Sequence, residues 1–258
     1  MSELLRVSWA LGRRATRNAL RRPQFLLPLV MFPSLFLAVN VGGLHRTTGL
    51  QGFPKVNGFL DFQLAAAMTQ SLLLGGITQG IASALDLELG FFDRLAVSPI
   101  SRVSIVIGRL IAAAAIAMFQ VGYFLALGLI FGASIEGGFL GVLVTFGLGL
   151  VAAIAFAAIG VAIALRAGNA STLQGIFPLV FVILFLSSAF FPRALLASPI
   201  DTFARYNPLS YIADGMRAPI IDSATSTAVL DGLFAGAGLA AFAVGMALLA
   251  LRGRLRNA

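Results

Sequence analysis

Apolar residues gather along this chain into long, almost uninterrupted runs, and most charged residues lie between them. A helix needs about 20 consecutive apolar residues to cross the hydrocarbon core of a bilayer. Six runs approach or exceed this length, namely residues 24–44, 59–84, 103–131, 139–165, 172–191 and 228–251. The pattern therefore predicts an all-α integral membrane protein with six transmembrane helices, which form a single transmembrane domain over residues 1–258.

Composition and charge fit a membrane protein. Hydrophobic residues make up 59% of the chain and charged residues 11%, with a mean hydropathy of +0.96, which lies outside the range of soluble globular proteins. The chain has no cysteine and one histidine, so we expect no disulfide and no metal site. The net charge of +8 comes from bases that flank the apolar runs, and lipid and topology explain it without a nucleic acid partner.

The basic residues also predict the orientation. Six crossings place both ends of the chain on one side of the membrane, and 13 of the 18 basic residues fall on that side, against 5 on the other. Loops on the cytoplasmic side carry the excess of arginine and lysine. We therefore expect both termini, and the loop after the second run, to be cytoplasmic.

The N-terminal segment, residues 2–22, predicts an amphipathic helix that lies on the membrane surface. Its arginines fall within an arc of about 100° around a helix, and Trp9 is suited to the membrane interface. A secretory signal is the alternative, but the basic region is too long and no small-residue cleavage site follows. The residues expected to anchor the helix on the membrane surface are Arg6, Trp9, Arg13, Arg14, Arg17 and Arg21.

The charged stretch between the second and third runs, residues 86–100, differs from an ordinary turn. Its acidic residues, Asp86, Glu88 and Asp93, precede the bases, and its leucines and phenylalanines recur at helical spacing. Acids early and bases late favour a short helix through its dipole, and Pro99 would end it. A short amphipathic helix at the inner mouth of a membrane bundle is suited to docking another protein.

Two polar features of the second run bear on function. Gln63 and Gln70 are seven residues apart and share one helix face, which we expect to look into the bundle because amides are costly against lipid. They either form hydrogen bonds between helices or line a substrate path, and the sequence leaves both open. Asp61 sits at the outer end of the run, where we expect water to reach it.

Two motifs resemble one known family. Residues 88–102 follow the order E-x-G-x-x-[DE]-R-L-x-x-S-P-x-S-R, and the next helix opens with I-G-R. Residues 190–217 contain F-F-P, then N-P-x-[ST]-Y, then an arginine. Both orders resemble permease subunits of ABC-2 type exporters, and the daunorubicin/doxorubicin branch in particular. Many members have Gly-Thr-x-Glu where this chain has Gly-Phe-Phe-Asp at residues 90–93.

The resemblance assigns roles to the first motif. In that family the loop is the coupling helix, which sits in a cleft of a separate ATPase subunit. Phe91, Phe92 and Leu95 would be its apolar anchors, and charged side chains would fix its register. The full set of coupling residues so implied is Glu88, Phe91, Phe92, Asp93, Arg94, Leu95, Pro99 and Arg102.

The resemblance also implies the rest of the assembly. Two short helices would dip into the outer membrane surface over residues 192–221, with Asn207, Pro208, Tyr211 and Arg217 as their motif. Two permeases, identical or paralogous, would form a dimer in the lipid bilayer of a bacterial plasma (inner) membrane. Two copies of the ATPase would bind them.

The chain lacks the residues for ATP hydrolysis. A P-loop needs a lysine within G-x-x-x-x-G-K-[ST], and the only lysine, Lys55, is followed by Val56. ATP and magnesium would therefore be held by the partner ATPase, and we expect no cofactor on this chain. Most acidic residues fall in loops and at helix ends, which also argues against a proton-driven carrier.

The expected function is export of a hydrophobic or amphiphilic cargo, such as a drug, a natural product or a lipid, with multidrug resistance as the implied role. A polysaccharide or glycolipid exporter is an alternative, although one tryptophan and three tyrosines supply few rings for stacking on sugars. Two proteins of other functional classes are further alternatives, namely a non-transporting membrane scaffold and an ion-coupled carrier. A scaffold would recruit a cytoplasmic partner through the same loop.

Overall fold

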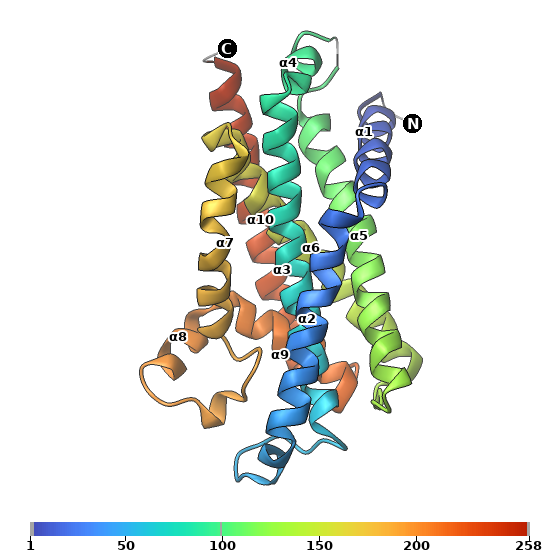
Figure 1. Cartoon of the computed structure of the whole chain (residues 1–258), viewed down its shortest axis with the longest axis vertical. Helices are drawn as coiled ribbons and strands as arrows, with labels where there is room; N and C mark the ends of the chain where they lie inside the picture. Colours follow the sequence, from blue (N-terminus) through green and yellow to red (C-terminus); the bar gives the residue numbers. More distant parts are fainter. Residues whose placement is uncertain (1–2, 99, 257–258) are drawn as a thin grey trace.

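The computed structural model describes residues 3–98 and 100–256, and this part of the chain is helical, without a β-strand (Figure 1). The all-α prediction is confirmed for it. Its α-helices are α1 (Glu3–Leu20), α2 (Pro23–Leu44), α3 (Phe59–Glu88), α4 (Phe91–Ala96), α5 (Val103–Ile130), α6 (Gly138–Ala167), α7 (Ala170–Phe185), α8 (Ile200–Tyr206), α9 (Pro208–Ile221) and α10 (Thr227–Arg256). Two short 3-10 helices, η1 (His45–Gly49) and η2 (Arg193–Leu195), join them.

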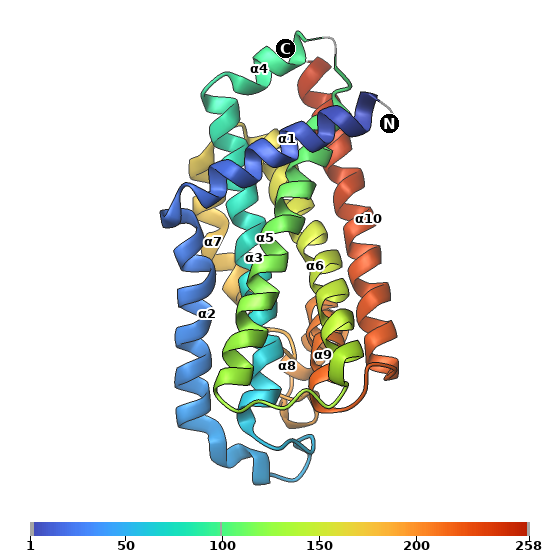
Figure 2. The same ribbon diagram turned by 90° about the vertical axis from the view of Figure 1, so that its right-hand side faces the viewer.

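The long helices run side by side along one axis, and the two ends of the bundle differ (Figures 1 and 2). Helix α4, helix α1 and both ends of the described chain lie at one end, whereas α8 and α9 lie toward the other. This arrangement agrees with the expectation that the termini and the loop after the second run share one side of a membrane. Which side faces the cytoplasm remains a prediction.

Helices occupy all six predicted runs, but only four of the described helices are long and apolar enough to cross a membrane. These are α2 with its η1 extension, α5, α6 and α10. Helix α3 has 30 residues but is not among the four. Helix α7 has 16 residues, hence a length of about 24 Å, which is shorter than the hydrocarbon core. The membrane crossings of α3 and α7 therefore remain predictions.

Helix α3 forms the centre of the bundle and contacts α2, α5, α6, α7 and α9. Residues 61–72 of this helix are all buried, including Gln63, Gln70 and Asp61. A helix enclosed by protein need not be apolar to lie in a membrane, because its polar groups do not meet lipid. This burial explains why α3 can be more polar than α2, α5, α6 and α7. It also overturns the expectation that Asp61 is solvated.

Glycines bring α3 and α6 into close contact. A methyl group built on Gly160 would lie 2.3 Å from the backbone oxygen of Gly76, and one built on Gly80 would lie 2.8 Å from the oxygen of Gly160. The four-residue spacing of Gly76 and Gly80 predicts such an approach. Gly160, on α6, has no glycine four residues before or after it, so the sequence did not indicate its role.

Helix α1 crosses the end of the bundle and packs on α5 (Figure 2). The contact is close because both helices present glycine: a methyl group on Gly108 would lie 2.7 Å from the Cβ atom of Leu11. The other face of α1 is open, and all six residues predicted to anchor it on the membrane surface are exposed. Their role in membrane anchoring remains a prediction.

Candidate coupling site and outer polar cluster

The segment expected to form one helix over residues 86–100 is divided in the structure. Asp86 and Glu88 belong to the last turn of α3, and a separate helix, α4, covers residues 91–96. Gly90 lies between them with φ of +66°, a left-handed conformation that glycine adopts without steric cost. The chain therefore turns at Gly90, and the prediction of one continuous helix is wrong.

The side chains exposed on this segment differ from the predicted anchors. Leu89 is 71% exposed and Val97 87%, on either side of α4, and Arg94 and Arg102 are exposed as well. Phe92, expected to face a partner, is only 5% exposed. It packs in an apolar cluster at the ends of α5, α6 and α10. The Gly90 turn rotates α4 so that Phe92 faces its own bundle, which helical spacing alone could not indicate.

Phe91 and Leu95 are partly buried and line a small pocket between α4 and helices α1, α3 and α5. The guanidinium of Arg14, on α1, lies 3.6 Å from the centre of the Phe91 ring, within range of a cation–π interaction. Arg14, predicted to anchor α1 on the membrane surface, thus also contacts the coupling segment. The side chain of Asp93 and all of Pro99 lie outside the described residues.

The acidic residues before Gly90 make contacts within the chain. The Asp86 carboxylate accepts a hydrogen bond from Arg109 of α5, and its Oδ2 atom lies 3.7 Å from Arg14 of α1. Glu88 Oε1 accepts a hydrogen bond of 2.8 Å from the backbone N–H of Ala170, at the start of α7. A carboxylate at a helix N-terminus stabilises the unpaired N–H groups and the helix dipole. The start of the predicted coupling segment (residues 86–100) is thus joined to α1, α5 and α7.

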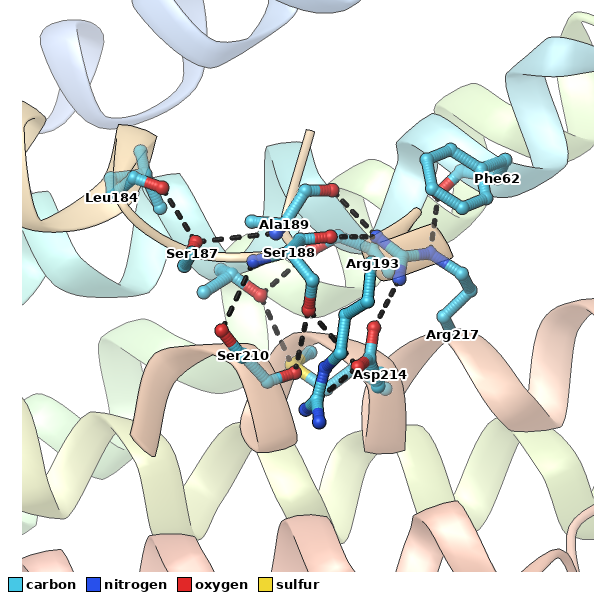
Figure 3. A network of polar contacts seen from close by, with 12 residues as sticks. Phe62, Leu184, Ser187, Ser188, Ala189, Arg193, Ser210, Asp214 and Arg217 are labelled. Carbon is cyan, nitrogen blue, oxygen red and sulfur yellow. Dashed lines mark hydrogen bonds and ion pairs between the residues drawn. The ribbon is translucent and has the colours of Figure 1, made fainter. Parts of the chain in front are cut away.

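At the other end of the bundle, Arg217 lies at the centre of a polar cluster (Figure 3). It is buried, pairs with Asp214, and donates hydrogen bonds to the backbone oxygens of Ser188, Ala189 and Phe62. Its guanidinium also lies 3.8 Å from the centre of the Phe62 ring. One side chain on α9 therefore holds α3 and the segment after α7 together. Arg217 belongs to the motif that the sequence predicted at this end. Asp214 does not, and only its position three residues before Arg217 could have indicated the pair.

The remaining members of the outer motif hold α9 in place. The Asn207 side chain accepts a hydrogen bond from the N–H of Leu209, which caps α9, and donates two to backbone oxygens at the end of α7. Pro208 occupies the first turn of α9, where proline is well tolerated. The Tyr211 hydroxyl donates to the backbone oxygen of Arg205, and the Arg193 guanidinium lies 4.3 Å from the Tyr211 ring.

Gln63 and Gln70 look into the bundle, as their spacing predicts, and each is buried. The Oε1 atom of Gln63 and both amide atoms of Gln70 have no hydrogen-bond partner among the described residues. Interhelical hydrogen bonding, one of the two predicted roles, thus finds no support at these three atoms. Neither glutamine lines the large apolar pocket described next.

A pocket of about 320 Å³ lies between α3, α6 and α7, with the start of α9 and one residue of α10 at its edge. Its lining is almost entirely apolar, and Asn207 is the only residue in it with a polar side chain. Its lining includes Leu73, Ile77, Ile159, Ile163, Leu173 and Ile176. Such a pocket is complementary to an aliphatic or aromatic group and offers little to a sugar.

These features define a helical membrane protein with an exposed, partly apolar loop at one end of its bundle and a polar cluster at the other. A model of the ABC-2 type transporter family matches residues 6–221, and the chain belongs to that family. Membership implies a transport role and association with an ATPase subunit. The suspected daunorubicin branch is a finer assignment than this match supports.

Three curated relatives carry the name "Putative transport permease ycf38". The proteins of Pyropia yezoensis and Porphyra purpurea are each 26% identical to this chain, over 81% and 83% of it and 72% and 74% of their own length. The protein of Cyanophora paradoxa is 25% identical over 76% of this chain and 68% of its own length. Their shared name agrees with a permease subunit.

Proposed function

We propose that this chain is the permease subunit of an ATP-driven exporter, and that the segment from Leu89 to Val97 receives force from a separate ATPase subunit. The observation that carries the proposal is the exposed apolar pair, Leu89 and Val97, beside α4 at the end of a family-matched bundle. Exposed apolar side chains on either side of a short helix suit a contact with a groove on a partner. Arg94 and Arg102 would set its register as charges at the rim.

Contacts within the chain offer a route for that force. Phe92 is packed inside the bundle, so a displacement of α4 would be passed to the ends of α5, α6 and α10. Glu88, the last residue of α3 and the one directly before this segment, is hydrogen-bonded to the start of α7, which forms one wall of the apolar pocket. ATP binding and hydrolysis on the partner would supply the free energy that shifts the bundle between inward-open and outward-open states. ATP and magnesium would both bind to the partner, which carries the catalytic site.

The proposed cargo is hydrophobic or amphiphilic, such as a drug, a natural product or a lipid. The apolar pocket of about 320 Å³ supports this class. The buried amide atoms of Gln63 and Gln70 that lack a partner among the described residues would serve a polar part of the cargo. Multidrug resistance, as in the daunorubicin/doxorubicin branch, rests on the sequence resemblance alone.

In the proposed assembly two permeases, identical or paralogous, pair about a two-fold axis, and each binds one ATPase subunit. All six runs would cross a bacterial inner membrane, with α4 and both termini in the cytoplasm. The excess of bases at that end supports this orientation.

The experiment is co-purification in detergent with the candidate ATPase, first with the unchanged chain and then with Leu89→Asp and Val97→Asp. Each change places a charge on an exposed apolar side chain, so the fold should survive while the ATPase is lost. Tyr206→Asp, at an 85% exposed position on α8, is the matched control and should retain the ATPase. Recovery of a complex with two copies of each subunit would support the assembly.

A functional measurement separates transport from recruitment. ATP hydrolysis by the complex in lipid vesicles should increase when cargo is added, and cargo should accumulate only with ATP. A partner that binds through Leu89 and Val97 without transport would favour the membrane scaffold. An ATPase retained by both aspartate variants would contradict the docking role of this segment.

A further inference from the structure

A further pocket of about 240 Å³ lies where α1 turns into α2, at the end of the bundle that also holds α4. We call it the elbow pocket. Residues from α1, from the turn, from the first turn of α2, and from α3 and α5 form its lining. Its polar members are Arg14, Asn18, Arg22, Thr78, Gln79, Asp86 and Arg109.

The elbow pocket has an excess of positive charge. Three arginines line it, one each from α1, the turn and α5, against a single acidic residue, Asp86. Asp86 is shared, because it accepts from Arg109 and lies 3.7 Å from Arg14. Arg22 is exposed and makes no ion pair within the described part of the chain. An anion entering the pocket would therefore meet uncompensated guanidinium groups.

A further amide in the same lining can pair with a polar ligand. Gln79 is only 4% exposed and lines the pocket, and its side-chain amide donates to none of the described residues. The amide atoms are not among the enclosed polar atoms that lack a partner, so the amide is open to the pocket and can pair with whatever occupies it. A phosphate oxygen can accept from this amide and from a neighbouring guanidinium at once.

The rest of the lining is apolar. Phe25, Ala82, Leu85 and Leu89 lie beside the polar members, so the pocket matches a molecule with an anionic group next to an alkyl chain. Its position fits as well, because α1 carries exposed arginines and Trp9 as a membrane-surface helix does. Basic pockets between membrane helices on the cytoplasmic side bind the head groups of anionic lipids.

We propose that the elbow pocket binds the phosphate group of an anionic phospholipid, held by Arg14, Arg22 and the amide of Gln79. A bound head group would bridge α1 and α3 beside Asp86. It would add a lipid contact to the protein contacts that already join these helices to α4. The inference does not depend on the cargo or on the ATPase.

The test measures lipid binding to the purified, delipidated full chain in neutral detergent by native mass spectrometry. The two probes are phosphatidylglycerol, which is anionic, and phosphatidylcholine, which has the same phosphate but no net charge. We expect tighter binding of phosphatidylglycerol. Arg22→Gln should weaken it about fivefold, the effect of one basic residue next to an anionic lipid. Gln79→Leu should also weaken it, without any change in charge.

Arg166→Gln is the matched control, because Arg166 is exposed in the last turn of α6, carries the same charge, does not line the pocket and is not one of the residues expected to anchor α1 on the membrane. It should bind phosphatidylglycerol as the unchanged chain does. Thermal unfolding of each variant verifies the fold, and Arg22→Gln is the safer of the two test variants because Arg22 is exposed. Equal losses for Arg166→Gln and Arg22→Gln would overturn the proposal in favour of diffuse surface charge.

Two further outcomes bear on the ligand. Equal binding of both lipids, or unchanged binding in both Arg22→Gln and Gln79→Leu, would overturn the proposal. Competition with inorganic phosphate separates the sources of the anion. Displacement of phosphatidylglycerol by millimolar phosphate would overturn the lipid as the ligand and assign the pocket to the free ion. Failure of phosphate to compete would support the lipid.

Discussion

Arg217 and Arg193 share one carboxylate, that of Asp214, yet they differ in what surrounds them (Figure 3). Arg217 is buried and donates to three backbone oxygens as well as to Asp214. Arg193 is partly exposed, with its guanidinium 3.1 Å from the carboxylate. Buried backbone oxygens that lose their donor destabilise a fold, whereas a partly exposed ion pair contributes little.

Arg217→Met should therefore destabilise the protein much more than Arg193→Met. The first change leaves three backbone oxygens without this donor, although Asp214 keeps Arg193 as a partner, at a cost of about 3–5 kcal/mol. The second loses a partly exposed pair and one aromatic contact, at about 1–2 kcal/mol. Thermal unfolding of the two variants in the same detergent measures the difference. Equal destabilisation of the two variants would mean that the buried hydrogen bonds of Arg217 add nothing to the stability of the protein.

At the scale of elements, glycine sets the distance between α3 and α6. Gly160→Ala places a methyl group against the backbone of Gly76 and Gly80, and backbone cannot move aside as a flexible side chain can. We expect a loss of about 1–3 kcal/mol, seen as a lower unfolding temperature. Gly147→Ala on the same helix is the control, because its methyl group would meet no atom within 4 Å. A Gly160→Ala protein as stable as this control would contradict the close contact.

The sequence allowed the elements to be predicted better than their contacts. Apolar periodicity and length located every long helix, and the four-residue spacing of Gly76 and Gly80 indicated a close approach. Neither signal names a partner, so the role of Gly160 was missed. The same limit applies to Phe92, because one left-handed residue, Gly90, decides whether its ring faces a partner or its own bundle.

The surroundings of buried polar residues could not be predicted from the sequence either. A buried helix tolerates polar side chains, so the composition of α3 could not distinguish the solvated Asp61 that we expected from the buried one observed. Asp61 accepts hydrogen bonds from the N–H and the hydroxyl of Ser134, more than 70 positions along the chain. The lining of the elbow pocket likewise joins residues from four helices and the turn between two of them. Such pairings follow from tertiary packing and leave no local pattern.

For the whole molecule, the opposite ends of the bundle provide a test of orientation. The natural chain has no cysteine, so a single introduced cysteine is the only thiol. Val97→Cys lies beside α4 and Tyr206→Cys at the end of α8, and both positions are highly exposed. With α4 in the cytoplasm, a membrane-impermeant maleimide should label Tyr206→Cys in intact cells and Val97→Cys only in inverted vesicles.

Each variant is the control for the other, because they differ only in the end of the bundle that carries the thiol. The reverse labelling pattern would place α4 and both termini outside the cell, where a cytoplasmic ATPase cannot reach them. Such a result would contradict the coupling role while leaving the fold intact. Labelling of both variants from the same side would instead contradict a bundle that crosses the membrane between α4 and α8. The orientation test therefore separates an error in the proposed function from an error in the membrane arrangement.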